Sequence, residues 1–370
     1  MPESVPVQSS DLAVFIGRFQ PFHRGHLKVI RQALAVARHV LVVIGSAGAA
    51  RRADMIPFTA DERQDMILAS LTVAERACVT TCAIPDLSNL RAWTAAVAEA
   101  AQATAHARGF GPDARITLIG CSKDRSSYYL KAFPTWDSIN VPAFDGLSAT
   151  PGRLAYFDAD PAVVDAYLEQ KAPQDLPPPV VAWLEGFRQG PDYGPLVEEM
   201  AWARRYREAW SAAPYPPIFV TADAVVVHDG QVLLIQRKGM PGKGLWALPG
   251  GFVEQDEFVV DAAIRELAEE TGLSVTASDL ERALVTTRVY DAPFRDMRGR
   301  VITHAALFVL EADQAAPPVA AAADDAADVR WFALGALRRE MLFGDHFAII
   351  QTLTGSDLGA RLVADRGAQS

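Results

Sequence analysis

The chain has 370 residues, of which 50% are hydrophobic and 22% are charged. This composition is typical of a folded globular protein and excludes disordered or collagen-like chains. The formal net charge of −10 argues against a protein that coats nucleic acid or an anionic membrane through a broad basic surface, because such binding neutralises phosphates. Since single domains usually span ~100–200 residues, we expect two domains.

The sequence shows no targeting signal and no redox motif. No apolar run approaches the ~20 residues of a membrane span, and the polar start MPESVPVQSSD lacks the basic region and apolar core of a signal peptide. We therefore expect a cytoplasmic protein. Cys78, Cys82 and Cys121 form no CxxC pair, so we interpret them as small buried apolar residues and not as metal or redox ligands.

Apolar runs alternate with helical stretches over the first third of the chain. This alternation predicts a parallel sheet of βαβ units, in which ligands bind at the carboxyl ends of the strands. The runs are residues 12–17, 40–47 and 114–121, and the helical stretches are residues 27–38, 60–71 and 90–107.

Two proline clusters, residues 172–180 and 211–219, bracket a helical stretch. Because proline removes a hydrogen-bond donor and fixes φ, the clusters indicate boundaries, and the stretch between them is either a spacer or a small helical packing element. After the second cluster, two β-branched runs flank Asp229-Gly230, which predicts a β-hairpin. We expect domains over residues 1–170 and 217–370, joined by a proline-bounded helical linker over residues 171–216.

The segment GRFQPFHRGH follows the first apolar run and contains the pattern HxGH, as His23, Gly25 and His26. Glycine lets the backbone approach a phosphate closely, a helix amino end offers unpaired N–H groups, and imidazoles can donate hydrogen bonds to phosphoryl oxygens. Nucleotidyl transfer needs mainly positioning and charge neutralisation, so this set suits a nucleotide phosphate site. A pair of histidines that caps a turn is the alternative.

This segment resembles the nucleotidyltransferase superfamily, whose signature G-x-F-x-P-x-H-x-G-H precedes a later S/T-x-x-R element. LSATPGR supplies Ser148, Thr150 and Arg153 for the later element. PFTADER, DLSNLRAW and SKDRSSYYL resemble stretches of nicotinamide mononucleotide (NMN) adenylyltransferases, and the resemblance covers about residues 11–160. One departure is Ile56, where many relatives carry Asn. The resemblance implies a Rossmann-like domain that forms NAD and pyrophosphate from NMN and ATP.

The resemblance also implies roles for residues around the phosphates. His23 and His26 would bind the ATP phosphates, with His26 nearest the α-phosphate that is transferred. Arg18 and Arg153 would neutralise the triphosphate and the departing pyrophosphate, and Mg²⁺ would bridge phosphate oxygens.

For the mononucleotide, the resemblance implies that Trp93 stacks on the nicotinamide ring and that Asn89 helps fix NMN. A core aromatic position is the alternative for Trp93. Lys123 and Asp124 are equally consistent with surface or capping residues. The residues expected to bind substrate in this domain are Gly17, Arg18, Phe19, Gly25, Asn89, Trp93, Lys123, Asp124, Ser148, Thr150 and Arg153.

In the second half, residues 251–273 match the pattern G-x5-E-x7-R-E-U-x-E-E-x-G-U, with U aliphatic, at every fixed position. An accidental match has a probability on the order of 10⁻⁷ for a chain of this length. On a helix Glu266, Glu269 and Glu270 share one face, and a divalent cation would reverse their mutual repulsion. The pattern therefore predicts a Mg²⁺ or Mn²⁺ site. A solvated acidic face is the alternative, but it would not require Arg265 or the flanking glycines.

This pattern is the Nudix box, and residues 218–350 resemble Nudix hydrolases. The resemblance implies an α/β/α sandwich in which the three glutamates bind Mg²⁺ and a water attacks a diphosphate linked to a nucleoside. The segment RVYDAPFRDMRGRVITHA resembles the corresponding part of ADP-ribose pyrophosphatases.

In that segment Arg295, Arg298 and Arg300, together with Gly251 of the box, are the residues expected to bind the diphosphate or a ribose phosphate. Solvated arginines beside a turn are an equal alternative. Asp345 and His346 supply either a general base or a helix cap.

The order of the two motifs resembles fused bifunctional NMN adenylyltransferase/Nudix hydrolases. We therefore predict NAD synthesis in the first domain and hydrolysis of ADP-ribose to AMP and ribose 5-phosphate in the second. The ligands would be ATP, NMN, NAD and ADP-ribose, with neither nucleic acid nor membrane as a partner. The alternatives are adenylylation of phosphopantetheine or nicotinic acid mononucleotide, and a Nudix domain that cleaves another nucleoside diphosphate derivative or only senses it. The sequence leaves a homo-oligomer open.

Overall fold

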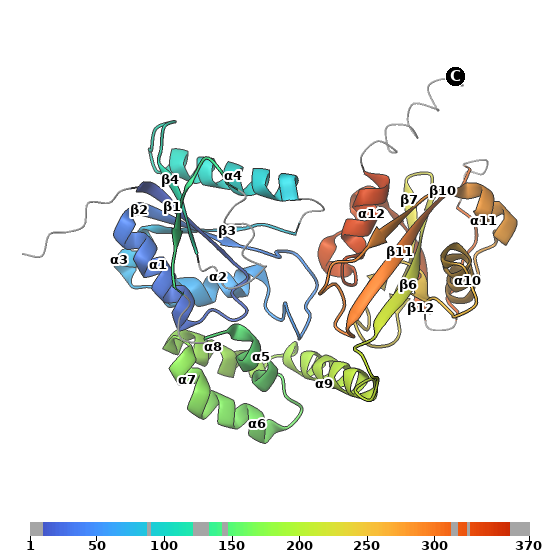
Figure 1. Ribbon diagram of the computed structural model, residues 1–370, viewed down its shortest axis with the longest axis horizontal. Helices are drawn as coiled ribbons and strands as arrows, with labels where there is room; N and C mark the ends of the chain where they lie inside the picture. Colours follow the sequence, from blue (N-terminus) through green and yellow to red (C-terminus); the bar gives the residue numbers. More distant parts are fainter. Residues whose placement is uncertain are drawn as a thin grey trace, which may run out of the picture. The chain divides into compact units, whose positions relative to one another are not determined.

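The computed structural model describes residues 10–86, 90–120, 133–142, 147–311, 317–323 and 326–355. The chain divides into two compact units, residues 1–200 and residues 201–370, and each unit contains its own sheet (Figure 1).

The sheet of the first unit is parallel and has the strand order β3-β2-β1-β4-β5. The chain runs outward from β1 in one direction and then crosses to β4 on its other side. Ligands of parallel α/β sheets bind at such a switch point, at the carboxyl ends of the strands. The predicted parallel sheet is therefore confirmed. Its strands are β1 (Ser10–Gly17), β2 (Ala37–Ile44), β3 (Val79–Ala83), β4 (Ile116–Gly120) and β5 (Asp137–Asn140).

Helices cover both faces of this sheet (Figure 1). Ile30 of α1 and Met66 of α2 are fully buried against one face, and Val97 and Ala101 of α4 are fully buried against the other. This double covering explains why the central strands are near-continuous apolar runs. The helices are α1 (Arg24–Val36), α2 (Ala60–Ala69), α3 (Val73–Ala77) and α4 (Leu90–Ala107).

A group of helices follows the sheet in sequence and joins the same core. Leu176, Val180, Leu184 and Met200 belong to the hydrophobic cluster that also contains α1 and α2 side chains. For the stretch between the two proline clusters, these contacts favour a helical packing element over a spacer up to residue 200. The domain boundaries at residues 170 and 217 stay a prediction. The elements are α5 (Ala149–Tyr156), α6 (Pro161–Ala166), a π-helical turn (Tyr167–Lys171), α7 (Ala172–Asp175), α8 (Pro178–Arg188) and α9 (Tyr193–Ala209).

The second unit contains a mixed seven-stranded sheet whose main path is β10-β11-β6-β7-β12, with β8 paired to β7 and β9 paired to β6. The predicted hairpin is confirmed, because His228 pairs with Gln231 and both intervening residues have positive φ, as a tight primed turn requires. The strands are β6 (Ile218–His228), β7 (Gln231–Arg237), β8 (Trp246–Ala247), β9 (Gly250–Phe252), β10 (Leu284–Tyr290), β11 (Arg300–Val309) and β12 (Ala326–Ala333).

Alternate side chains of β6 enter two different hydrophobic clusters. Ala222 and Ala224 pack with α10 residues, whereas Val225 and Val227 pack with α12 residues. The sheet is therefore sandwiched between helices, as Figure 1 shows, and the predicted α/β/α sandwich is confirmed. The helices are α10 (Val259–Thr271), α11 (Ala277–Ala283) and α12 (His346–Thr354), with short 3₁₀ turns at Leu334–Ala336 and Arg339–Met341.

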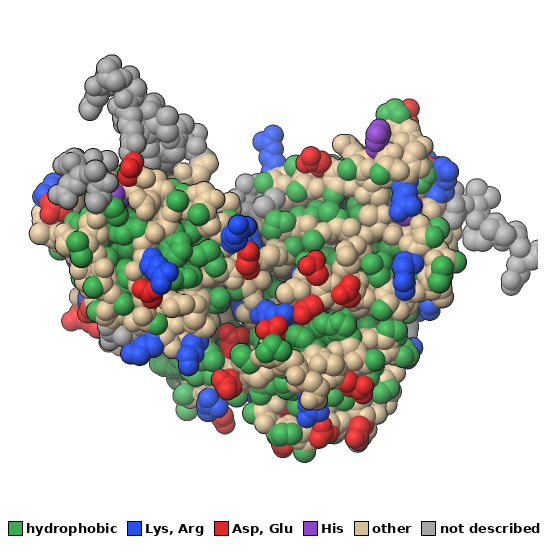
Figure 2. Space-filling view, turned by 180° about the vertical axis from the view of Figure 1, so that it is seen from behind, with side chains coloured by type: hydrophobic (Ala, Val, Ile, Leu, Met, Phe, Trp, Pro, Cys, Tyr) green, Lys and Arg blue, Asp and Glu red, His purple; other side chains and the backbone are tan. Residues whose placement is uncertain are grey.

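The surface of the described residues mixes side chains of all kinds. On the face drawn in Figure 2, lysines and arginines are scattered among acidic and apolar side chains. No described helix is both long enough and apolar enough to cross a membrane. Cys78 and Cys82 are free and only partly buried, and Cys121 lies outside the described residues.

Candidate active sites

The two histidines of the HxGH pattern meet at the amino end of α1. His23 is the N-cap residue, and its Nδ1 accepts a hydrogen bond from the His26 N–H at 3.3 Å, while His26 Nδ1 accepts from the His23 N–H at 3.2 Å. The rings stack with centroids 3.5 Å apart. In a neutral imidazole an accepting Nδ1 places the proton on Nε2. The pair therefore caps the helix through Nδ1 of each ring, and in the neutral ring Nε2 is the nitrogen that carries the proton.

The neighbouring Gly17 leaves no room for a side chain, and Gly25 leaves little room for one. A Cβ would lie 2.7 Å from the Phe19 ring at Gly17, and 3.1 Å from the His23 ring at Gly25. Phe19 is only 1% exposed and lies edge-on against His26, with centroids 4.9 Å apart. Its ring therefore supports the histidine pair, and only its backbone is placed to contact a substrate.

Arg153 lies beside the turn between β1 and α1. It is buried and donates hydrogen bonds to the carbonyl oxygens of Gln20 and Asp54, both at 2.8 Å. Burial, with a smaller contribution from the nearby Arg18, lowers its pKa to about 10. Among the described residues Arg153 forms no ion pair, so its positive charge remains available to an anion. Arg18 itself is exposed.

The later motif element forms the start of α5. Ser148 is the N-cap residue and accepts from the Thr150 N–H at 3.4 Å. Arg153 donates to the Thr150 hydroxyl oxygen at 3.4 Å. The structure thus brings Thr150 and Arg153 together, as their spacing predicts.

Trp93 is a half-buried residue of α4 that packs against the hydrophobic core, with its ring 6.3 Å from that of Phe133. Trp93 therefore makes the core contacts expected of a structural aromatic residue. Its stacking on the nicotinamide ring stays a prediction. Asn89, Lys123 and Asp124 lie outside the described residues.

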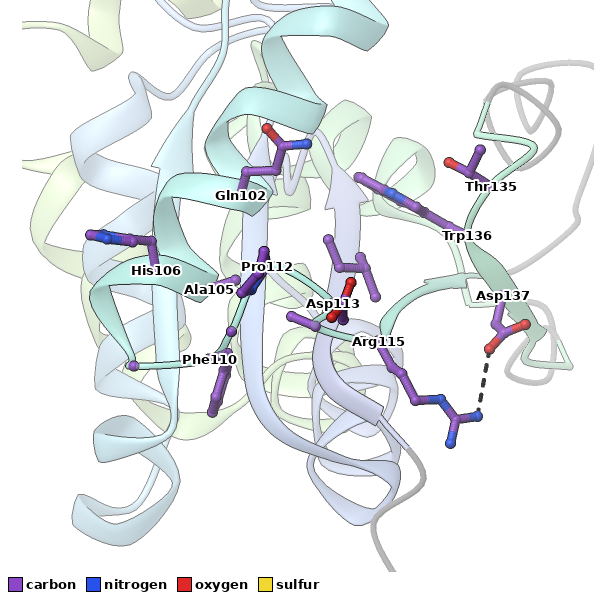
Figure 3. A pocket seen from close by; sticks show the side chains of 14 residues that line it. Gln102, Ala105, His106, Phe110, Pro112, Asp113, Arg115, Thr135, Trp136 and Asp137 are labelled. Atoms are coloured by element: carbon purple, nitrogen blue, oxygen red, sulfur yellow. Dashed lines mark ion pairs between the residues drawn. The ribbon is translucent and has the colours of Figure 1, made fainter.

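A pocket of about 1000 Å³ lies near the amino ends of β4 and β5, where the loop that leads into β4 meets the end of α4 (Figure 3). Trp136 and the 4.0 Å ion pair between Arg115 and Asp137 border it. Because parallel sheets bind ligands at the carboxyl ends of their strands, we place the first site at the histidine pair and not here.

In the second unit, Arg265 holds the acidic side chains of the Nudix box together. Its guanidinium contacts the carboxylates of Glu257 at 2.7 Å, Glu266 at 2.9 Å and Glu269 at 3.0 Å. Arg265 lowers the pKa of Glu257. The ion pairs fix the loop before α10 to the helix itself.

Glu270 points toward the sheet and is 7% exposed. Its Oε2 accepts a hydrogen bond from the Gly250 N–H at 2.9 Å. Burial, together with the charge of Glu266, raises its pKa to about 8, although the hydrogen bond from Gly250 acts in the opposite direction. A side chain at Gly251 would collide with the Glu266 carboxylate. Gly251 therefore lets the Glu266 carboxylate approach the backbone of β9, and Gly250 leaves room for Ala222 and Asp223 of β6.

A pocket of about 40 Å³ adjoins these glycines. Arg295 is ion-paired with Asp345 at 2.7 Å, and Arg298 with Asp296 at 2.7 Å. Arg300 does not line the pocket and pairs with Asp291. The residues that line the pocket are Thr221, Asp223, Arg237, Leu248, Gly250, Gly251, Arg295, Asp296, Arg298, Phe343, Gly344, Asp345 and His346.

His346 does not suit the role of a general base. Its Nδ1 accepts from the Leu248 N–H at 2.9 Å, and burial lowers its pKa. A neutral ring in this setting carries its proton on Nε2 and donates it. Asp345 is the N-cap residue of α12, but its side chain makes no capping bond and pairs with Arg295 instead.

Comparison with known proteins matches both units. Residues 14–98 match the Cytidylyltransferase-like family, and residues 218–353 match the NUDIX domain family. The crystal structure of a bifunctional NMN adenylyltransferase/ADP ribose pyrophosphatase from Francisella tularensis, complexed with AMP and a manganese ion, is 35% identical. The match covers 93% of this chain and 98% of that chain, with a TM-score of 0.83. The chain belongs to this bifunctional family.

Each half of this bifunctional chain also resembles a separate protein. Nicotinamide/nicotinic acid mononucleotide adenylyltransferase of Acinetobacter baylyi is 41% identical over 149 residues, which are 40% of this chain and 76% of that protein. ADP-ribose pyrophosphatase of Methanocaldococcus jannaschii is 40% identical over 132 residues, which are 36% of this chain and 70% of that protein. The family predicted from the sequence is confirmed.

Divalent metals are used by this family, and the donor set of the Nudix helix fits one. Glu266 and Glu270 are hard oxygen donors, and burial raises the pKa of both, so a cation would stabilise their charged forms. In the described part of the chain, however, no three such side chains are gathered closely enough to enclose a cation. Glu266 and Glu269 are ion-paired with Arg265 instead.

Two arginines, one fully buried and one partly buried, have positions that the sequence does not predict. Arg63 is fully buried and donates to the carbonyl oxygens of Arg18 at 2.8 Å and Gly45 at 2.7 Å, at the ends of β1 and β2. Its i, i+3 spacing from the buried Met66 is a signal that would have placed it on the inner face of its helix. Arg237 lines the second pocket and lies over the Phe343 ring, 4.4 Å from its centroid.

Proposed function

We propose that the chain is a two-site enzyme of NAD metabolism. The first site forms NAD and pyrophosphate from NMN and ATP, and the second hydrolyses ADP-ribose to AMP and ribose 5-phosphate. The observation that carries this proposal is that one chain holds both an HxGH helix end, at the switch point of a parallel sheet, and a complete Nudix box on the helix of a sandwich.

At the first site the 5′-phosphate of NMN attacks the α-phosphorus of ATP in line. A P–O bond forms to NMN while the bond to the β-phosphate oxygen breaks, and pyrophosphate leaves. His23 and His26 donate hydrogen bonds to the phosphates beside the amino end of α1. Arg18 and Arg153 offset the charge of the departing pyrophosphate. Bound Mg²⁺ supplies further charge neutralisation.

At the second site Glu266, Glu269 and Glu270 would hold Mg²⁺ or Mn²⁺, which when bound supplies an acidified water and offsets charge on the diphosphate. Arg265 contacts Glu257 through two hydrogen bonds, and this contact would hold the loop in place if Glu266 and Glu269 turned from Arg265 to the cation. The guanidinium groups that line the pocket bind the diphosphate oxygens.

The test is to assay the purified full-length chain with Mg²⁺. We expect NAD from ATP and NMN, and AMP from ADP-ribose. Nicotinic acid mononucleotide and phosphopantetheine are tested in parallel with NMN. Absence of NAD from NMN would reject the first assignment. Binding of ADP-ribose without release of AMP would favour a sensor over a hydrolase.

A cytoplasmic location and self-association stay predictions, as do ligands limited to small nucleotides. Light scattering on the purified chain measures the oligomeric state, and fractionation of the cells that produce it measures the location.

A further inference from the structure

A buried carboxylate in β6 is not explained by the Nudix box. Asp223 is 6% exposed and stands in a strand segment, residues 221–228, in which every residue is buried. Burying a carboxylate among apolar neighbours is costly unless it has a partner. Its Oδ2 accepts a hydrogen bond from the Thr303 hydroxyl. Among the described residues Asp223 has no other hydrogen bond and no ion pair.

The pocket that contains this carboxylate is also lined by a hydrogen-bond donor, the ring of His346. Asp223 and His346 both line it, and Asp223 exerts an electrostatic influence on the His346 ring. The Leu248 N–H occupies Nδ1 of His346, so the neutral ring presents an Nε2–H donor. The described residues give that Nε2 no hydrogen-bond acceptor. One wall of the pocket therefore combines an acceptor with a donor.

The size and charge of the pocket restrict what can bind there. A volume of about 40 Å³ leaves room for hydroxyl groups, since a single water needs only ~10–15 Å³ of such space. A phosphate in direct contact with Asp223 would be repelled, whereas Arg295 and Arg298, which also line the pocket, suit the neighbouring diphosphate. A metal ion would meet Arg237 and two carboxylates, Asp296 and Asp345, that are already paired with arginines.

We propose that Asp223 and His346 form a subsite for the two neighbouring hydroxyls of a substrate ribose. Asp223 accepts a hydrogen bond from one hydroxyl, and the Nε2–H of His346 donates to the oxygen of the other. Carboxylates recognise ribose hydroxyls in the same way in dinucleotide-binding folds. The subsite rests on the proposed hydrolysis of ADP-ribose, and it makes the second site selective for diphosphates that carry an intact ribose diol.

The test compares ADP-ribose with two analogues, each of which lacks the 2-hydroxyl of one ribose, using full-length protein and Mg²⁺. We expect the unmodified chain to cleave one analogue at least about tenfold less efficiently than ADP-ribose. Asp223→Asn keeps the size of the side chain and an oxygen for Thr303. It should lower kcat/KM for ADP-ribose by about 10–100-fold, mainly through KM, and remove the discrimination between substrates, since a hydrogen bond to a charged group is lost.

Two further variants examine the donor. In His346→Gln an amide can accept from Leu248 and still donate, so we expect discrimination to persist. In His346→Leu the donor is gone, so discrimination should disappear. Asp279→Asn, on the exposed surface of α11, is the matched control and should change neither rate nor discrimination. Because the second unit has its own hydrophobic clusters, the check that it has folded is its own unfolding transition in each variant, measured by chemical denaturation.

Three outcomes separate the possibilities. Equal loss on all three substrates in Asp223→Asn would overturn the subsite and leave only a structural role. A weaker affinity for Mn²⁺ alone, measured by electron paramagnetic resonance without nucleotide, together with unchanged discrimination, would overturn it in favour of a metal ligand. If the unmodified chain releases no AMP from ADP-ribose, the proposed function itself fails. In that case calorimetry of ADP-ribose binding in EDTA still tests the subsite, and equal affinity in Asp223→Asn would overturn it.

Discussion

At the scale of single residues, His23 has both a structural role and a proposed catalytic role, and a substitution that removes both cannot distinguish them. It caps α1 through Nδ1, and the proposed chemistry uses the rest of the ring. His23→Ala removes both, whereas His23→Asn keeps an N-cap side chain, since Asn is among the best caps. We expect both variants to form NAD at least about 100-fold more slowly, as for loss of a positioned donor, and only His23→Ala to lose about 1 kcal/mol of stability.

The measurements are NAD formation from NMN and ATP, and the free energy of unfolding from denaturant titration. ADP-ribose hydrolysis should be unchanged in both variants. Near-normal NAD formation by His23→Asn would show that the ring only caps the helix.

His39 gives the first unit a dependence on pH. It is 3% exposed, its Nε2 lies 2.8 Å from the Thr80 hydroxyl oxygen, and burial lowers its pKa to about 4, with Arg108 contributing. Below pH 6.5 the unfolded chain binds a proton that the folded chain refuses, so stability falls as the pH drops from about 6.5 to about 4. At 1.36 kcal/mol per pKa unit, the loss is roughly 3 kcal/mol.

Chemical denaturation at a series of pH values measures this loss, and His39→Gln should remove most of it. His106 is more exposed and lies on α4, so His106→Gln is the matched control and should keep the full dependence. An identical pH profile in His39→Gln and the unmodified chain would contradict the assignment.

At the scale of elements, Arg63 joins three of them. From α2 it donates to backbone carbonyls at the ends of β1 and β2. A lysine has one point of charge and cannot span these acceptors. In Arg63→Lys the loop that carries Arg18 should therefore shift, and we expect kcat/KM for NAD formation to fall by at least about tenfold. Arg91→Lys, on the exposed surface of α4, should have no effect. Unchanged kcat/KM in Arg63→Lys would show that the loop holds its position without this arginine.

The elements also show why the sequence predicts some features and not others. The Asp229-Gly230 turn and the His23 cap depend on residues that adjoin in sequence, so a local pattern predicts them. Arg63 and Asp223 are charged residues in buried positions. Their burial results from contacts with residues distant in sequence, so a local pattern does not predict it. The same reason applies to the helices up to residue 200, whose proline-rich sequence indicates a boundary although their apolar faces complete the first core.

At the scale of the whole molecule, each unit holds its own hydrophobic core and its own site. The proposed reactions therefore need not depend on each other. Glu270→Gln removes a charge whose carboxylate is buried beside Gly250 and keeps an oxygen for that N–H. We expect it to lower ADP-ribose hydrolysis at least about 100-fold, as for loss of a metal-holding charge, and to leave NAD formation unchanged.

The decisive comparison mixes His23→Asn with Glu270→Gln in equal amounts. Independent sites predict that the mixture forms NAD at the rate of its Glu270→Gln component and hydrolyses ADP-ribose at the rate of its His23→Asn component, because each variant keeps one intact site. Glu281→Gln, on α11 and outside both sites, replaces Glu270→Gln in the control mixture. If Glu270→Gln alone slows NAD formation while its unfolding transition is unchanged, the two sites are coupled and the account of two independent reactions is wrong.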